Sequence, residues 1–140
     1  MGVLIRSEDW PERLQQAVAA ARDVPYQLGK HDCLRFTCQC IAAMTGVDFW
    51  PRFAGYTTRR QALVTIARIA PSLGEAVTIV LERPAQPVAL CRRGDVLLYE
   101  DAAGEHLGVC LGLDVAVLGD AGLAFVRLDH PGLRSGWRIG

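Results

Sequence analysis

The chain has 140 residues, 51% of them hydrophobic, and its 15 basic and 15 acidic residues give a net charge of zero. This length suits one domain with a substantial apolar core. The balanced charge argues against a general nucleic-acid binder and a polybasic membrane anchor. No apolar run approaches the ~20 residues of a membrane-spanning helix. The first residues are too poor in apolar side chains for a secretory signal, and Arg6 stands where myristoylation requires Ser or Thr. We expect synthesis in the cytosol and no membrane insertion.

The first half of the chain has helical patterns. One helix is expected between Asp9 and Pro25, with Asp9 and Glu12 as a capping box. A second helix is expected over about 32–45, with Gly46 as its C-terminal cap. This segment is apolar nearly all round, so we expect it to be central and buried.

Two more helices are expected before the strands begin. A third helix should follow over about 57–70. Residues 72–82 are ambiguous, because Ser72 and Glu75 resemble a capping box whereas the residues 77–80 favour a strand. We favour a short helix there.

The second half has the pattern of short strands separated by turns. Four strands are expected over 96–100, 107–111, 115–118 and 123–128, followed by a last strand that includes 137–139. Helices followed by strands predict an α+β fold, with the N-terminal helices packed on a C-terminal antiparallel sheet. No linker or repeat divides the chain, so residues 1–140 are expected to form a single domain.

The chain has five cysteines, Cys33, Cys38, Cys40, Cys91 and Cys110. An odd number in a chain of this size does not predict a disulfide framework. Free buried thiols are the simplest interpretation of most of them. Zinc is disfavoured, because positions 38 and 40 of one helix point about 200° apart and no Cys or His pair follows. We therefore expect neither a metal nor another cofactor.

Cys33 is placed for chemistry, because it stands at the start of the predicted buried helix. Free N–H groups and the helix dipole at such a position stabilise a thiolate and an oxyanion. His106 precedes a strand-like run and can therefore lie at the rim of a sheet, facing a cleft. A cysteine with a distant histidine is the minimal constellation of a thiol protease. A structural cysteine and a solvated loop histidine are the simpler alternatives for each residue alone.

Four motifs occur in the order that is typical of one enzyme family. They are Tyr26 with Gly29, Asp32-Cys33, Gly94-Asp95, and the run His106-Leu107-Gly108-Val109-Cys110-Leu111-Gly112. Over roughly residues 24–128 the chain resembles the NlpC-type, papain-like cysteine peptidases. The resemblance implies an NlpC-type fold and cleavage of amide bonds in peptidoglycan stem peptides.

The resemblance also implies roles for individual residues. Cys33 would be the nucleophile and His106 the general base. The Cys33 backbone N–H and Tyr26 would stabilise the oxyanion, and Asp32 would lie at the same cleft. His31 is either a second functional histidine beside Cys33 or a loop residue.

The chain departs from the family pattern at three places. Leu34-Arg35 stand where Ser-Gly is usual, and Leu28 replaces a tryptophan. The polar residue that orients the histidine is replaced by Leu118. Asp120 and Asp114 are the nearby polar candidates for the orienting role, but neither falls in register. A histidine without an orienting partner has a less fixed tautomer, which weakens catalysis.

A short variant of the family, found in tail proteins of phages and prophages, is a closer match. The shared features are Trp10, the run Gly29–Cys33, and the ending Trp137-Arg138-Ile139. This resemblance implies a virion tail component that contacts other tail-tip or hub proteins and acts at the cell wall.

Three functions remain open from the sequence. The first is a tail-associated cysteine peptidase or amidase. The second is a structural tail-tip or tail-assembly component that keeps the fold with weak or no activity. The third, less favoured, is a host-encoded thiol acyltransferase of the same broad fold.

Overall fold

The computed structural model describes residues 4–140. The first three residues, on which part of the expectation about a signal segment and myristoylation falls, lie outside the described residues. Within the described part, the helices are α1 (Trp10–Arg22), α2 (Cys33–Thr45), α3 (Arg59–Ala67) and α4 (Leu73–Leu81), with short 3₁₀ turns at Trp50–Arg52 and Val88–Leu90. None of these helices has the length and apolar character needed to cross a bilayer.

The strands form one five-stranded sheet in the order β4-β3-β2-β1-β5, and every neighbouring pair is antiparallel. Their bounds are β1 Val96–Asp101, β2 Gly104–Cys110, β3 Asp114–Gly119, β4 Gly122–Arg127 and β5 Leu133–Trp137. The predicted α+β fold, with helices first and an antiparallel sheet second, is confirmed. The last strand, β5, ends at Trp137, the residue at which the predicted last strand begins.

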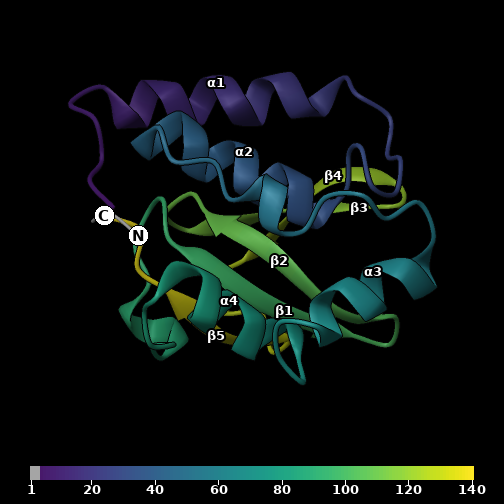
Figure 1. The fold of residues 1–140 in the computed structure, drawn as a ribbon. Coiled ribbons are helices and arrows are strands. Elements are labelled where there is room, and N and C mark those ends of the chain that lie inside the picture. The colour runs from purple at the N-terminus through teal and green to yellow at the C-terminus, as the bar shows by residue number, and fades with distance from the viewer. Residues whose placement is uncertain (1–3) are drawn as a thin grey trace.

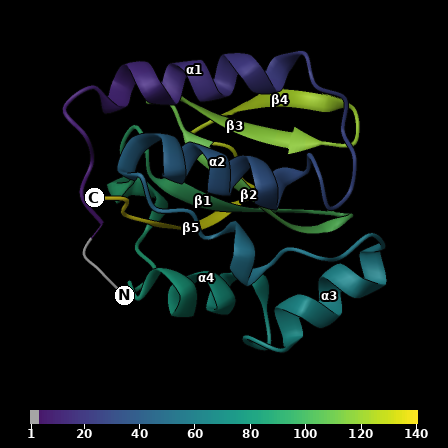
Figure 2. The same ribbon diagram turned by 45° about the horizontal axis from the view of Figure 1, so that its top comes forward.

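The helices cover one face of the sheet. Helix α2 lies between α1 and the strands, as Figure 1 shows, and the turned view of Figure 2 again places α1 on the opposite side of the molecule from α3 and α4. One core cluster joins the buried sides of α1, α2 and α4 to alternate strand residues such as Leu98, Leu107 and Val109. The residues between them, such as Leu97 and Cys110, form a second, smaller cluster on the other face. This alternation is the period-two pattern of strands.

Helix α2 begins and ends as predicted. The Asp32 carboxylate accepts a hydrogen bond from the Arg35 N–H at 2.9 Å. Gly46 adopts φ 78° and donates its N–H to the Ala42 carbonyl. The helix is buried along most of its length, because α1 covers one side and the sheet the other. Position 33 is thereby fixed as the first residue of a central helix.

The predicted capping box of α1 is wrong. The Asp9 backbone has φ −95° and ψ 25°, which differs from the extended conformation of most N-cap residues. Its carboxylate instead accepts a hydrogen bond from the Arg13 guanidinium at 2.8 Å, one turn along the helix. A carboxylate engaged in this way does not cap the first turn.

The ambiguous segment 72–82 is helical, as favoured. Its buried residues, Leu73, Ala76, Val77, Val80 and Leu81, recur at helical spacing and face the core. Ser72 caps α4 by accepting a hydrogen bond from the Glu75 N–H at 3.2 Å. Burial of one helical face therefore outweighs the strand preference of the β-branched residues.

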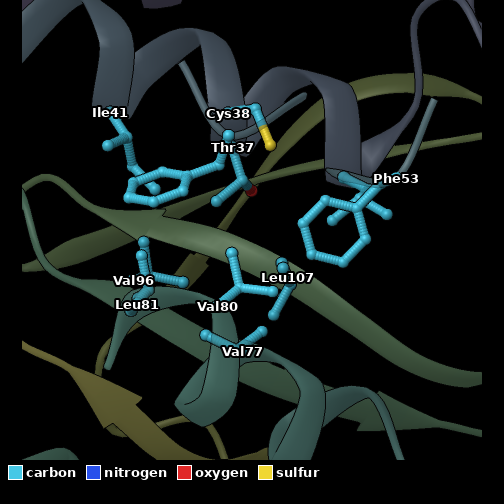
Figure 3. Close-up of a pocket in the computed structure, with 11 residues that line it drawn as sticks. Thr37, Cys38, Ile41, Phe53, Val77, Val80, Leu81, Val96 and Leu107 are labelled. Atoms are coloured by element: carbon cyan, nitrogen blue, oxygen red, sulfur yellow. The ribbon is translucent and has the colours of Figure 1, made fainter. Parts of the chain in front are cut away.

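A small cavity of about 20 Å³ lies between α2, α4 and the strands β1 and β2. Figure 3 shows its apolar lining, with Thr37 of α2 among these side chains. Thr37 is 2% exposed, and its hydroxyl has no hydrogen-bond partner among the described residues. The volume suits about one water molecule, but a stable water needs two to four polar partners, which this lining does not offer.

Replacing Thr37 with valine is expected to raise the free energy of unfolding by about 1 kcal/mol. Valine has nearly the same shape and removes a buried hydroxyl that lacks a partner. Urea denaturation followed by circular dichroism measures the change. Thr65→Val is the control, because the exposed Thr65 hydroxyl donates to the Gln61 carbonyl at 2.9 Å. A loss of stability in Thr37→Val alone would instead indicate a bound water on the hydroxyl.

Candidate functional site

A cleft of about 480 Å³ lies at one end of the sheet, between α2, α3 and the hairpin of β1 and β2. Five of the seven residues singled out from the sequence line it, namely Tyr26, Asp32, Cys33, His106 and Asp120. The lining includes residues from both faces of the sheet, such as Leu118 and Val117, so the cleft wraps around the ends of the strands.

Asp32 anchors the start of α2. The side chain is 3% exposed, and its Oδ2 accepts hydrogen bonds from the Gly29 N–H at 2.8 Å and the Tyr56 hydroxyl at 2.5 Å. Its Oδ1 caps α2, as described above. Burial and the bond to Asp32 raise the pKa of Tyr56, so the phenol stays protonated and donates. Asp32 is thus fully occupied in holding the loop that presents Cys33. Tyr56 was not among the residues predicted for the site.

His31 points away from the cleft. It is 6% exposed, and its Nε2 lies 3.3 Å from the Ala21 carbonyl at the end of α1. This contact ties the loop before α2 to α1. His31 is not among the residues that line the cleft, and its contact with Ala21 suits a packing role.

Cys33 is partly exposed, whereas the other four cysteines are buried. Burial of its sulfur raises the pKa of Cys33 to about 11, and the Asp32 carboxylate adds to this effect. Hydrogen bonds from backbone N–H groups, first that of Leu107 and then that of Leu34, act in the opposite direction without cancelling it. Near neutral pH the group is a thiol, so a base must remove its proton before it can attack a carbonyl.

The alkylation rate of Cys33 by iodoacetamide is therefore expected to rise about tenfold per pH unit between pH 7 and 10. Only the thiolate reacts, and its fraction grows in this way below a pKa of about 11. Mass spectrometry of modified peptides measures the rate at each pH. A rate that is constant below pH 8 would contradict the raised pKa and indicate a preformed thiolate–imidazolium pair.

His106 is the third residue of β2 rather than a residue before the strand, because β2 begins at Gly104. It lies opposite Tyr99 of β1, so both side chains project from the same face of the hairpin. The His106 Nε2 is 2.9 Å from Asp101 Oδ1, and the Tyr99 ring lies 6.1 Å from the imidazole between centroids. The hydrogen bond from His106 lowers the pKa of Asp101, so this carboxylate is ionised and acts as the acceptor.

Cys33 and His106 share the cleft without a hydrogen bond between them in the described part of the chain. Leu107 faces α2 and donates its N–H to the Cys33 sulfur, whereas His106 projects from the opposite face of the strand. The two side chains therefore reach the same cleft from opposite faces of the sheet. Catalytic hydrogen bonds are often long in a free enzyme and tighten only when substrate binds.

The two carboxylates proposed as orienting residues do not bond to His106. Asp120 lies in the turn after β3 and lines the cleft, but its carboxylate makes no hydrogen bond to the imidazole. Asp114 begins β3, at the end of the strand remote from His106, and is not among the cleft residues. Leu118 is 1% exposed and belongs to the core on the helix face. Asp101, which was not among the predicted site residues, lies next to the ring.

The short turn between Asp101 and Gly104 was the signal that could have revealed this partner. An Asp followed by two residues and a Gly, between β-rich runs, is typical of a hairpin. Extending the second strand back to Gly104 places Asp101 beside His106. Among residues 4–140, no group of three or more His, Cys, Asp or Glu side chains could hold a metal ion.

Comparisons with known proteins agree with this fold. A model of the family described as "Domain of unknown function (DUF6950)" matches residues 5–139. No curated protein sequence matches the chain. Among solved structures, the fold is similar to RipD from Mycobacterium tuberculosis, described as a non-catalytic NlpC/p60 domain protein adapted to peptidoglycan binding. The TM-score is 0.50 at 15% identity, over 95% of this chain and 99% of RipD. The chain therefore belongs to the DUF6950 family, and its fold is that of the NlpC/p60 domains.

Proposed function

We propose that this protein is a cysteine peptidase or amidase that cleaves an amide bond in peptidoglycan stem peptides. The observation that carries the proposal is the shared cleft, in which a thiol at a helix N-terminus and an imidazole bound to a carboxylate both face the same space. A cleft of this volume accommodates a short peptide segment. RipD, of the same fold, is described as peptidoglycan-binding, which supports this class of ligand.

The proposed reaction begins with proton transfer from Cys33 to His106. Because the Asp101 carboxylate only accepts, the His106 Nε2 carries the proton and Nδ1 has the free electron pair. Nδ1 takes the thiol proton as the sulfur attacks the substrate carbonyl. The first N–H groups of α2 and the Tyr26 hydroxyl would stabilise the oxyanion. Burial raises the pKa of Tyr26, so it remains a donor.

The tetrahedral intermediate then breaks down to an acyl-enzyme, which is hydrolysed in a second stage. The C–N bond breaks, and the protonated His106 returns its proton to the leaving amine, which leaves a thioester on Cys33. A water molecule, deprotonated by His106, hydrolyses the thioester and restores the thiol. Because the pKa of the free Cys33 thiol is raised, catalysis depends on His106 as the base and not on a thiolate that is already present before substrate binds.

The protein would act at the cell wall as a component of a virion tail. The resemblance of Trp10, the run Gly29–Cys33 and Trp137-Arg138-Ile139 to tail proteins supports a virion tail that carries the enzyme to the cell wall. Its partners there would be other tail-tip or hub proteins and the stem peptide.

A second candidate is a non-catalytic component that binds peptidoglycan or serves tail assembly. The observation in its favour is the neutral Cys33 thiol, which has no hydrogen bond to His106 in the described structure. RipD provides a precedent for an NlpC/p60 fold described as non-catalytic.

Digestion of purified muropeptides tests the two candidates. The protein is incubated with the fragments, and mass spectrometry with amine labelling detects a cut amide bond. Protein that has been alkylated at alkaline pH serves as the inactive control. Cleavage that the alkylated sample lacks supports the enzyme. Retention of the fragments on immobilised protein without any cleavage supports the binding component and overturns the enzyme.

A further inference from the structure

We infer that Asp101 is the positioning residue of His106 and that Arg59 of α3 holds the turn that carries Asp101. Nothing in the family pattern assigns either residue, since the orienting position of that pattern is occupied by the buried Leu118. The inference rests on the proposed function, because a fixed tautomer matters for a histidine that serves as a base.

The hairpin register brings Asp101 to the ring. Tyr99 lies opposite His106, and Asp101 follows two residues later on the same face, opposite Gly104. Diagonal neighbours of this kind are within reach of long or aromatic side chains. The result is the 2.9 Å contact between the His106 Nε2 and Asp101 Oδ1. The same Oδ1 accepts the Ala103 N–H at 2.8 Å, which fixes the orientation of the carboxylate.

Tyr99 limits the freedom of the imidazole. Its ring lies 6.1 Å from that of His106 and 5.3 Å from that of His130, between centroids. Gly132 packs so tightly behind Tyr99 that an added Cβ would lie 2.7 Å from the tyrosine ring. The imidazole therefore has a packed neighbour on the hairpin and a carboxylate at Nε2, which together leave Nδ1 for the cleft.

Arg59 connects this turn to the opposite wall of the cleft. Its guanidinium donates from Nη2 to the Ala103 carbonyl, inside the turn that follows Asp101. Helix α3 has no buried residue, yet its Leu63 and Ile66 line the cleft. The Arg59 contact therefore joins α3, which has no buried residue, to the turn next to Asp101. A ligand that binds against α3 would contact the helix whose Arg59 holds the turn next to Asp101.

The test uses the tautomer of His106, which can be measured without any substrate. Nitrogen-15 NMR of histidine-labelled protein should show the tautomer with the proton on Nε2 in the unaltered protein. Asp101→Asn should give a mixture of tautomers, because an amide can donate or accept. Asp101→Glu should restore the original tautomer in part. Arg59→Ala should shift the populations in the direction of Asp101→Asn, whereas the adjacent Arg60→Ala should not.

Kinetics separate this inference from the proposed function. If muropeptides are cleaved, Asp101→Asn should lower kcat by roughly 10²- to 10⁴-fold with little change in KM, as expected for a residue that acts through the base. If no variant and not even the unaltered protein cleaves, the proposed function fails while the tautomer result still stands. Unchanged tautomer populations in both Asp101→Asn and Arg59→Ala would overturn the inference.

Discussion

Replacing Cys33 with alanine is expected to reduce muropeptide cleavage by roughly 10⁴-fold or more, since removal of a nucleophile leaves only binding and oxyanion stabilisation. The fold should persist. Asp32, which caps α2, and Tyr56, which binds Asp32, do not depend on the Cys33 sulfur. The lost contact between the sulfur and the Leu107 N–H should cost about 1 kcal/mol of stability at most. Amine release from muropeptides and the urea midpoint are the two measurements.

A second cysteine provides the matched control. Cys91 is 6% exposed and belongs to the cluster on the other face of the sheet, away from α2. Cys91→Ala should lose some stability and keep the cleavage rate per folded molecule. Cys33→Ser should behave like Cys33→Ala, because a hydroxyl is a far weaker nucleophile. Equal cleavage by Cys33→Ala and the unaltered protein would refute the assignment of Cys33.

The parts of the fold that depend on local contacts could be predicted from the sequence. The cap of α2 needs an acceptor at Asp32, a donor at Arg35 and a glycine at position 46, all close in the chain. The order of helices and strands follows from their periodicities. The same local rules failed at Asp9, because a neighbouring arginine competes for the carboxylate. A local pattern shows which bonds can form and leaves open which of two partners is preferred.

The parts of the site that depend on tertiary contacts could not be predicted in this way. Tyr56 reaches Asp32 from 24 positions away, and Arg59 reaches Ala103 from 44 positions away. Neither pair has a motif of its own. Asp101 is different, because only five positions separate it from His106. It was missed because the predicted strand began at Leu107, which hid the register of the hairpin. Because the predicted strand started three residues too late, the pairing that places Asp101 beside His106 could not be recognised.

The loop before α2 shows why the motif has a glycine at position 29. Gly29 has φ +82°, in the left-handed region, and donates its N–H to Asp32 Oδ2. The Tyr56 carbonyl lies against its α-carbon, on the side that a Cβ would occupy. The Tyr56 hydroxyl bonds to the same oxygen of Asp32. Gly29 is thus the point where two loops meet, and Cys33 is presented from that junction.

Replacing Gly29 with alanine is therefore expected to destabilise the protein by roughly 2–5 kcal/mol. The left-handed φ costs ~1–2 kcal/mol for any residue with a Cβ. An added Cβ would also lie 2.1 Å from the Tyr56 carbonyl oxygen, so one loop must move, at a cost of ~1–3 kcal/mol. Gly46→Ala separates these two effects. Gly46 has φ +78°, but an added Cβ would meet no atom within 4 Å, so it should cost ~1–2 kcal/mol alone.

The two variants should also differ at the site. Displacement of Tyr56 in Gly29→Ala would break its bond to Asp32 and loosen the start of α2. The Cys33 sulfur should then be alkylated faster at a given pH, because burial is the main reason for its raised pKa. Gly46→Ala changes only the far end of the same helix and should leave the alkylation rate unchanged. Equal losses of stability in the two variants, with equal alkylation rates, would show that the two loops do not depend on their close contact at Gly29.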